Sequence, residues 1–233
     1  MFTASAKYYD LIYSFKDYAS ESKAIAALIA QHHPTAKSVL DVGCGTAEHL
    51  RFLPDSFQIE GLDLDPGLLE LAQAKFPGKS FHCADMSDFH LGKRFDVVLC
   101  MFSSIGYVLT VDKLQSTLAC FAQHLNSGGI VVVEPWFSKE NWKQGNLSML
   151  THDGEDLKIC RMTQTNLEDG HSILHFQYLI AERGQAMQHL TERHALALFE
   201  ESEFRTAFQA AGLAVDFDPQ GLTGRGLYVG KLG

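Results

Sequence analysis

The segment Ser38-Val-Leu-Asp-Val-Gly-Cys-Gly-Thr-Ala47 constrains the fold more than any other part of this chain. Val39 to Val42 is typical of a short buried strand, and an acid and a Gly-x-Gly turn lie at its end, before a helix begins near Thr46. Glycines at such a turn allow a ligand to approach the backbone where a Cβ would block it. The layout therefore predicts a nucleoside-bearing cofactor over the carboxyl end of the strand.

Two classes of cofactor fit this turn. A dinucleotide site usually continues as G-x-G-x-x-G with a helix start facing the pyrophosphate, but the third glycine position is Glu48 here. A carboxylate at that position would repel a diphosphate. S-adenosylmethionine (SAM) has no phosphate and carries a cationic sulfonium and ammonium, so Asp41 at the strand end is compatible with it. The remaining alternative is a strand–helix corner in which Gly43 and Gly45 serve packing only.

A second acid, Asp63, comes at the end of the next apolar segment, about twenty residues after the glycine turn. Its two carboxylate oxygens are suited to accept hydrogen bonds from both vicinal hydroxyls of a ribose. Leu64 is expected to lie against one face of an adenine. Asp65 is the better N-cap for a helix that begins near Pro66, which leaves Asp63 free for the ribose.

A third acid follows the third apolar segment, in His82-Cys-Ala-Asp-Met86. Asp85 is expected to accept from the exocyclic amine of adenine, and the backbone N–H of Met86 to donate to a ring nitrogen. On its own, Asp85 would be an ordinary turn residue. Its place behind the glycine turn and Asp63 favours the functional interpretation.

The fourth apolar segment, Phe95 to Phe102, leads to the reaction centre. The backbone carbonyls of Cys100 and Met101 are expected to hold the ammonium group of the cofactor. These four signals in one register predict a SAM site, and D-V-G-C-G-T resembles motif I of the class I SAM-dependent methyltransferases. The expected cofactor-binding residues are Tyr9, Tyr18, Asp41, Gly43, Cys44, Gly45, Asp63, Leu64, Asp85, Met86 and Met101.

Composition limits the function classes. The chain has 233 residues, of which 46% are hydrophobic, and a net charge of −9 without any Lys/Arg run. Nucleic acid and anionic membranes are therefore not expected partners, and a small-molecule substrate is. The five cysteines are scattered without metal-ligand spacing, so we expect reduced thiols, a cytoplasmic location and no metal. Met1 to Asp10 lacks the layout of a signal peptide, and no apolar run is long enough to span a bilayer.

Apolar runs alternate with amphipathic stretches over residues 20–135, which predicts a parallel sheet covered by helices. The expected helices are Ala19 to His32, Ala47 to Leu53, Pro66 to Phe76 and Val111 to Leu125, the last closed by Asn126 to Gly129. The expected strands are Ser38 to Val42, Gln58 to Leu62, Ser80 to Cys83, Phe95 to Met101 and Ile130 to Glu134.

The pattern changes after Trp136. Three segments with partial period-two alternation predict a small antiparallel insertion of about three strands, namely Leu157 to Gln164, Ser172 to Glu182 and Gln188 to Leu198. A helix from Phe204 to Ala211 and two last strands, Ala214 to Phe217 and Gly226 to Gly230, complete the main sheet. An antiparallel last hairpin distinguishes the methyltransferase fold from the dehydrogenase fold.

Three further segments carry a closer resemblance. Met101-Phe-Ser-Ser-Ile-Gly106, Val131-Val-Val-Glu-Pro-Trp136 and Gly224-Arg-Gly-Leu-Tyr-Val-Gly230 resemble the bacterial sugar N,N-dimethyltransferases. Those enzymes methylate the 3-amino group of nucleotide-linked deoxyamino sugars of the desosamine and mycaminose type. The resemblance extends over nearly the whole chain. It implies an α/β class I (Rossmann-like) fold with a seven-stranded sheet, an antiparallel flap over the active site, and a monomer or homodimer.

This resemblance divides a single domain, residues 1–233, into four parts. They are an N-terminal lid and helix (1–33), a SAM-binding core (34–136), an antiparallel β insertion over the active site (137–200) and a C-terminal helix with the last strands (201–233). The chain departs from the family pattern at three positions. Tyr107 stands where the family has His, Trp136-Phe137 where a second Trp is usual, and Thr46-Ala47 where the motif I turn commonly has a further Gly.

Three residues are expected to act in the chemistry: Tyr107, Glu134 and Tyr13. Tyrosine has a pKa of about 10 and is a poor base at neutral pH, so Tyr107 is expected to line the substrate pocket. Glu134 would accept from the substrate ammonium or, equally, bond a nearby backbone donor. Tyr13 belongs with Tyr9 and Tyr18 to an aromatic group that either covers the cofactor and amine or packs as a helix stripe.

The expected substrate-binding residues are Ser103, Ser104, Trp136, His189 and Arg225. His189 and His194 are separated by an odd number of residues, so on one strand at most one of them points into the site. Arg225 lies between two glycines, where it meets a phosphate or carboxylate of the substrate or is exposed to water.

The leading hypothesis is an N-methyltransferase that uses SAM, releases S-adenosylhomocysteine, and acts on an amine of a small metabolite, such as an amino-sugar nucleotide. Two alternatives keep the cofactor. One is an O- or carboxyl-methyltransferase, and the other is a non-catalytic SAM-binding protein. Glu48 disfavours a third, an NAD-dependent oxidoreductase.

Overall fold

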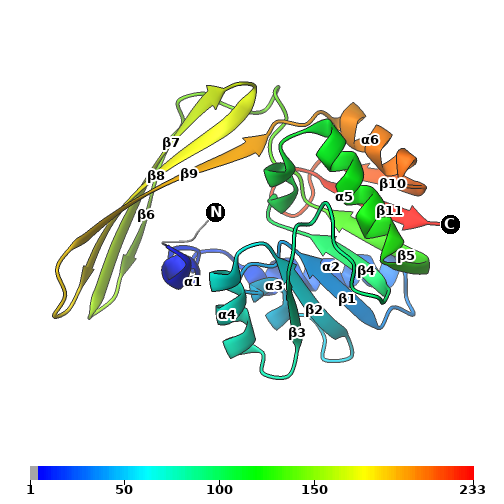
Figure 1. Cartoon of the computed structure of the whole chain (residues 1–233), viewed down its shortest axis with the longest axis horizontal. Coiled ribbons are helices and arrows are strands. Elements are labelled where there is room, and N and C mark those ends of the chain that lie inside the picture. The colour runs from blue at the N-terminus through cyan, green and yellow to red at the C-terminus, as the bar shows by residue number, and fades with distance from the viewer. Residues whose placement is uncertain (1–4) are drawn as a thin grey trace.

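The computed structural model describes residues 5–233 of the protein. It contains two β-sheets: one has helices on both faces, and the other extends away from it (Figure 1). The larger sheet has seven strands in the order β10-β11-β5-β4-β1-β2-β3. These strands are β1 (Ser38–Val42), β2 (Gln58–Asp63), β3 (Ser80–Cys83), β4 (Phe95–Cys100), β5 (Leu125–Val133), β10 (Leu213–Asp218) and β11 (Leu227–Leu232).

Strand directions in this sheet confirm the predicted fold class. Strands β1 to β5 are parallel, whereas β11 is antiparallel to both of its neighbours, β5 and β10. Strand β1 lies between β2 and β4, so the chain winds outward from β1 in both directions. In such sheets ligands bind at this reversal, in the crevice outside the carboxyl ends of the strands.

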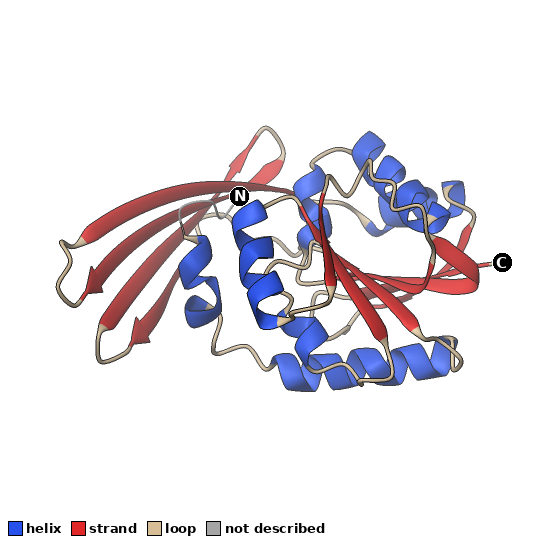
Figure 2. Cartoon of the chain, turned by 60° about the horizontal axis from the view of Figure 1, so that its bottom comes forward, coloured by secondary structure: helices blue, strands red, loops and turns tan. Residues whose placement is uncertain are grey.

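Helices cover both faces of the seven-stranded sheet (Figure 2). One face packs against α5 (Val111–Gln123) and α6 (Glu201–Ala210), and the other against α2 (Tyr18–His32), α3 (Glu48–Arg51) and α4 (Pro66–Lys75). Within β1, Leu40 and Val42 pack toward α5, while Val39 packs toward α2. Because successive strand residues alternate between faces, Asp41 lies on the side of Val39. An acid on a buried face of a central strand indicates a function at that end of the strand.

The second sheet is antiparallel and has the order β6-β7-β8-β9. Its strands are β6 (Leu147–Asp153), β7 (Leu157–Glu168), β8 (His171–Glu182) and β9 (Gln188–Ala197). The prediction of about three strands is thus wrong by one strand. Strand β6 was missed because it is an edge strand whose apolar residues do not alternate, with Leu147 and Met149 exposed on one side and Leu150 half-buried on the other.

Several boundaries also differ from prediction. Strand β7 ends at Glu168 and not at Gln164, and α6 begins at Glu201 and not at Phe204. Strand β5 begins at Leu125 and not at Ile130, because Leu125 pairs with Phe95 and Ile130 with Val97. The residues between them, which we expected to form a closing turn, bulge out of the strand. The helix predicted from Ala47 to Leu53 is a single turn, α3.

The N-terminal segment connects the two sheets. After η1 (Ala6–Tyr8), the short helix α1 (Tyr9–Ile12) packs with Tyr13 against Ile159 and Tyr178 on the inner face of the second sheet (Figure 1). Residues 1–4 of the expected lid lie outside the described residues. Between residues 5 and 233 no helix is both long and apolar enough to cross a membrane. The same range holds no group of three His, Cys, Asp or Glu side chains that could bind a metal ion.

Candidate active site

A cavity of about 1270 Å³ lies between the carboxyl edge of the seven-stranded sheet, the N-terminal segment and the inner face of the second sheet. All predicted site residues except Glu134 and His189 line it. They are Tyr9, Tyr13, Tyr18, Asp41, Gly43, Cys44, Gly45, Asp63, Leu64, Asp85, Met86, Met101, Ser103, Ser104, Tyr107, Trp136 and Arg225. The topology therefore brings together residues that are up to 216 positions apart in the chain, from Tyr9 to Arg225.

The glycine turn forms the floor of the cavity. Gly43 and Gly45 have φ values of +71° and +55°, in the left-handed region that favours glycine. A Cβ on Gly43 would lie 2.6 Å from the Cβ of Ser104, so only glycine allows this close approach. Ala47 also has a positive φ, +64°, which explains why related turns place a glycine there. Burial raises the pKa of the Cys44 thiol well above its ordinary value, so this side chain is a neutral part of the floor.

Asp63 is held by two backbone donors at the cavity wall. Its Oδ2 accepts from the N–H of Gly45 (2.8 Å) and its Oδ1 from the N–H of Asp65 (2.9 Å). Burial raises its pKa above the ordinary value. Asp65 caps α4 by accepting from the N–H groups of Gly67 and Leu68, as predicted. Each Asp63 oxygen keeps a second lone pair, which suits it to a pair of hydroxyls.

Asp41 is the most unusual acid in the cavity wall. It is 1% exposed, and neither carboxylate oxygen has a hydrogen-bond partner within residues 5–233. Burial raises its pKa to about 7, while His49 lowers it and Asp63 raises it further. A buried carboxylate without partners is costly unless a cation binds to it. The ammonium group of SAM supplies such a cation, so the residues present fit this cofactor.

Asp85 lies in the part of the cavity wall where we expect the adenine of the cofactor. Its Oδ1 accepts from both the N–H and the hydroxyl of Ser87, each at 2.8 Å. These hydrogen bonds, and above all the one from the backbone N–H, lower the pKa of Asp85 below its ordinary value. The carboxylate is therefore charged and can accept a further hydrogen bond. Lys113 also lines the cavity and donates to the hydroxyl of Ser87 (2.9 Å), a contact that the sequence did not indicate.

The backbone after β4 is strained. Phe102 and Ser103 have φ values of +51° and +64°, which are rare for residues other than glycine and typical of functional sites. The hydroxyl of Ser103 donates to the carbonyl of Pro135 (2.8 Å), and that of Ser104 to the carbonyl of Gly43 (3.2 Å). Both serines thus use their hydroxyl protons to hold this strained turn against β5 and the glycine turn. If these serines orient the substrate, as we expect, their hydroxyl oxygens can do so only as hydrogen-bond acceptors.

Glu134 does not face the cavity as expected. It is fully buried and accepts from the N–H of Phe102 (2.8 Å), from the guanidinium of Arg225 (3.1 Å) and from the hydroxyl of Thr223. The N–H of Glu134 also donates to the carbonyl of Cys100 (2.9 Å). We had expected this carbonyl to accept from the ammonium group of the cofactor. Of the two partners predicted for Glu134, a substrate ammonium or a nearby backbone donor, the structure shows the backbone donor. Glu134 holds Phe102 and Arg225 in place.

Arg225 reaches the cavity from the loop before β11. Its guanidinium carbon lies 5.5 Å from the ring centre of Phe102 and 5.8 Å from that of Trp136. Its Nε and the Nε1 of Trp136 are buried and have no partner in the described part of the chain. Both donors are therefore available to acceptors on a ligand.

Aromatic rings from the N-terminal segment form the opposite wall. Tyr9 and Tyr13 have ring centres 4.6 Å apart, and Tyr13 meets Phe102 edge-on at 5.3 Å. Tyr18 contacts His49 at 4.9 Å. Burial raises the pKa of both Tyr9 and Tyr18, so their hydroxyls are neutral donors at physiological pH. The three tyrosines are thus brought together at the cavity, as expected.

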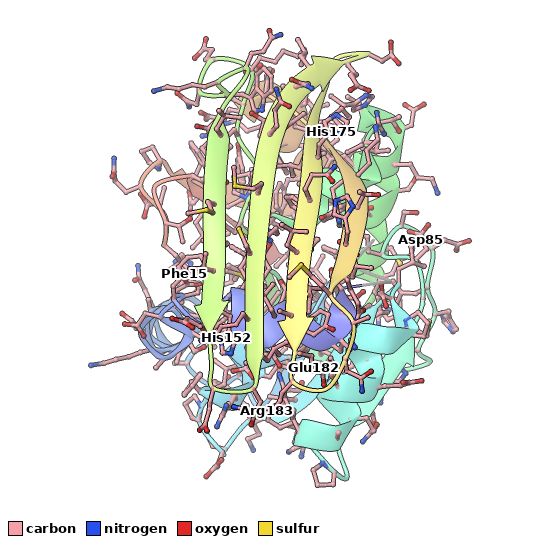
Figure 3. All side chains as sticks on the ribbon, turned by 90° about the vertical axis from the view of Figure 1, so that its left-hand side faces the viewer. Phe15, Asp85, His152, His175, Glu182 and Arg183 are labelled. Atoms are coloured by element: carbon pink, nitrogen blue, oxygen red, sulfur yellow. The ribbon has the colours of Figure 1, made fainter. Side chains whose placement is uncertain are left out.

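The prediction of His189 as a substrate residue is wrong. It lies exposed on the outer face of the second sheet, where its ring bonds the side chain of Gln177 at 2.7 Å. The same outer face, with His175, is seen in Figure 3. His194, on the opposite face of β9, is buried and bonds Tyr107. The odd spacing predicted that the two histidines face opposite ways, but not which one faces the cavity.

Arg161 is a second residue that the sequence did not indicate. It lies on the inner face of β7, is 5% exposed and lines the cavity. Its NH1 group donates to the hydroxyl of Tyr13 (2.9 Å), and its guanidinium carbon lies 4.4 Å from the ring centre of Phe176. Within residues 5–233 it has no carboxylate partner, and its Nε and the hydroxyl of Thr163, two residues along the same face, are buried without partners.

Comparison with known proteins places these features in a family. Residues 39–129 match a family model described as a methyltransferase domain. The chain is 41% identical to the dTDP-3-amino-3,6-dideoxy-alpha-D-glucopyranose N,N-dimethyltransferase of Streptomyces fradiae, over 98% of this chain and 91% of that protein. The crystal structure of Streptomyces venezuelae DesVI is 38% identical, covers 98% of both chains and has a TM-score of 0.92. The structure of SAM-bound CalS10, an amino pentose methyltransferase from Micromonospora echinaspora, is 31% identical, covers 94% of this chain and 92% of its own, and has a TM-score of 0.84. The chain therefore belongs to the SAM-dependent methyltransferases, in the family of the bacterial sugar N-methyltransferases.

Proposed function

We propose that this protein transfers methyl groups from SAM to the amino group of a deoxyamino sugar linked to a nucleoside diphosphate. The relative from Streptomyces fradiae carries this activity in its name. The cavity supports the same activity because its two sides have opposite charge. Asp41, Asp63 and Asp85 line the sheet edge, and Arg161 lines the opposite side, on the inner face of the second sheet. The acids suit a cationic cofactor, and the arginine suits an anionic substrate.

The observation that carries this proposal is the unpaired cation of Arg161. Removing a guanidinium from water costs several kcal/mol unless an anion compensates for it. Within residues 5–233 its partners are neutral: the hydroxyls of Tyr13 and Tyr178, and the rings of Tyr13 and Phe176. Together with the unpartnered hydroxyl of Thr163, it offers the donors that a diphosphate requires.

The amine of the substrate would lie between the two sides, among the rings of Tyr9, Tyr13, Phe102 and Trp136. These rings exclude water and favour a neutral amine, because desolvation penalises the ammonium form. The cofactor, when bound, supplies a methyl group on a cationic sulfur. The protein then has to hold the amine lone pair in line with that methyl group and to keep water away, and positioning can supply most of the rate.

The direct test is a transfer assay with isotope-labelled SAM and dTDP-3-amino-3,6-dideoxy-alpha-D-glucose. Labelled sugar nucleotide is expected, with mass spectrometry showing the addition of one and then two methyl groups. Label in hydroxyl or carboxyl compounds but in no amine would contradict the proposal.

Arg161→Met gives a sharper test of the substrate class. We expect the KM for the sugar nucleotide to rise about tenfold or more, since a charge-assisted contact is lost, while the KM for SAM stays within about twofold. Arg193→Met is the matched control, since Arg193 lies on the outer face of β9 and pairs with Glu168. An Arg161 variant that affects both KM values equally would show that the arginine is only structural.

The location and assembly of the enzyme are part of this proposal. All five cysteines are free thiols, which supports the cytoplasm. A monomer or a homodimer is expected. The outer face of the second sheet exposes Leu147, Met149, Met162 and Leu179, a surface of the kind that a second copy can cover. Light scattering of the purified protein distinguishes the two states.

A further inference from the structure

Tyr107 connects the cavity to a buried histidine. It belongs to the 3₁₀ turn η2 (Ser104–Val108), lines the cavity and keeps 37% of its surface exposed there. Its hydroxyl lies 2.9 Å from Nδ1 of His194 on β9, and the two rings meet at 68° with their centres 5.9 Å apart. His194 itself is 1% exposed. One hydroxyl thus separates this imidazole from the cavity.

The second nitrogen of His194 faces a carboxylate. Its Nε2 lies 3.4 Å from Oε2 of Glu192, two residues earlier on the same face of β9. Glu192 is itself fixed, because it accepts from the N–H of Ser5 (3.0 Å) and from the hydroxyl of Ser5 (2.9 Å). A carboxylate only accepts, so these partners assign the proton of neutral His194 to Nε2 and leave Nδ1 to accept from Tyr107.

We propose that Tyr107, His194 and Glu192 form a proton relay that removes the extra proton of the substrate ammonium before methyl transfer. This inference rests on the proposed function, since it requires an amine in the cavity. The ammonium donates a proton to the oxygen of Tyr107 while the proton of Tyr107 passes to Nδ1 of His194. The amine gains its lone pair, Tyr107 remains a neutral phenol, and the new imidazolium faces the carboxylate of Glu192.

The proton count of the whole cycle balances. The nitrogen loses one proton to the relay and then forms one bond to the methyl carbon, whose bond to the cationic sulfur breaks with its electron pair left on sulfur. The nitrogen therefore carries a positive charge again, and the sulfur becomes neutral. The imidazolium returns its proton through Tyr107 to water in the cavity when the product leaves. One proton is released for each methyl group transferred. A second methylation needs a second passage through the same relay.

Charges around the relay explain why the histidine, and not the tyrosine, holds the proton. Burial raises the pKa of Tyr107 well above its ordinary value, and the nearby acids Asp63 and Glu192 raise it further, so a phenolate does not accumulate. Burial lowers the pKa of His194, and the guanidinium of Arg161 on β7 acts in the same direction, whereas Glu192 raises it. From β8, the ring of Phe176 covers the imidazole at 4.8 Å. His194 is thus neutral at physiological pH and able to accept, with Glu192 ready to stabilise its charged form.

The test compares pH profiles. His194→Gln keeps an acceptor for the Tyr107 hydroxyl but cannot take up a proton. Tyr107→Phe keeps the ring at the cavity wall and removes the hydroxyl. The same pH profile is expected for it, so it tests the relay even if His194→Gln does not fold. His175→Gln is the matched control, since His175 lies on the outer face of the neighbouring strand and bonds Glu168 (Figure 3).

With dTDP-3-amino-3,6-dideoxy-alpha-D-glucose as substrate, both relay variants should lower kcat about a hundredfold at pH 7. Activity should return as the pH rises toward the pKa of the free amine, because the substrate then arrives neutral. SAM affinity should be unchanged, and His175→Gln should match the wild type throughout. Tyr107→His in the His194→Gln background should restore activity at pH 7, since it places an imidazole directly at the cavity wall.

Two results would overturn the relay. One is a loss of kcat that is uniform across pH, which indicates that His194 only positions Tyr107. The other is a His194→Gln enzyme with the wild-type profile. An inactive wild type overturns the proposed function instead, and the relay with it, because no amine would then be available to deprotonate.

Discussion

Replacing Asp41 with Asn is expected to stabilise the ligand-free protein and, at the same time, to weaken SAM binding. The carboxylate is 1% exposed and has no hydrogen-bond partner within residues 5–233. Burial raises its pKa from 3.8 to about 7, although the nearby His49 lowers this pKa by a smaller amount. The folded protein therefore keeps a proton on Asp41 over a pH range in which the unfolded chain has already lost it.

The sign and the size of the effect follow from this difference. Between pH 4 and pH 7 the folded state binds one more proton than the unfolded state, so the free energy of unfolding falls as the pH rises. Each pKa unit corresponds to about 1.4 kcal/mol, and the shift of about three units therefore costs about 4 kcal/mol at pH 7 and above. Asn carries no charge and does not incur this cost. The cation of the bound cofactor would remove it in the wild type.

Urea unfolding of the ligand-free proteins between pH 5 and pH 8 measures this directly. The advantage of Asp41→Asn over the wild type should grow by about 2 kcal/mol between pH 5 and pH 7 and level off by about pH 8. Asp55→Asn, an exposed acid outside the cavity, is the control and should follow the wild type. Calorimetry at pH 6 should show that the wild type releases a proton on binding SAM and that Asp41→Asn binds about tenfold or more weakly. Parallel unfolding curves for the wild type and the Asn variant would refute the reasoning.

Two further substitutions test the floor and the wall of the cavity. Gly43→Ala should abolish measurable SAM binding and lower the urea midpoint more than Gly78→Ala, because both positions have positive φ but only Gly43 has a side chain, Ser104, within 2.6 Å of the new Cβ. Equal effects of the two alanines on stability and an unchanged SAM affinity would show that the close approach is unimportant. Glu134→Gln should destabilise the protein by about 3 kcal/mol, because it leaves the part-buried Arg225 without its carboxylate. If Glu134→Gln loses activity without losing stability, Glu134 takes part directly in the reaction.

The cofactor half of the site could be predicted from the sequence because it follows from local rules. Gly43, Asp63 and Asp85 each lie at the end of a strand or within two residues of it, and the carboxyl ends of parallel strands meet at one edge of the sheet. Strand length and apolar runs gave β1 to β4 to within one residue at each end. No contact between distant segments was needed for these positions.

The substrate half depends on contacts that the sequence does not encode locally. Which face of β9 is inward is set by the packing of the second sheet on the N-terminal segment, so His189 was chosen although His194 is the histidine on the inner face, behind Tyr107. The role of Glu134 is set by Arg225, 91 residues later in the chain. Strand β6 shows the same limit, since an edge strand with apolar residues on its exposed side has no period-two signal.

The opposite charges of the two sides of the cavity explain why the chain needs a second sheet at all. The edge of the seven-stranded sheet supplies acids for a cation, and an anionic substrate could not bind among them. The inner face of the second sheet supplies the buried cation Arg161 from β7 and the imidazole of His194 from β9. Because these two strands lie on either side of β8 in a continuous antiparallel ladder, the proposed anion-binding and proton-accepting groups are held at a fixed distance from each other. Substitutions on this inner face should therefore change which amine is methylated, while the cofactor continues to bind at the sheet edge.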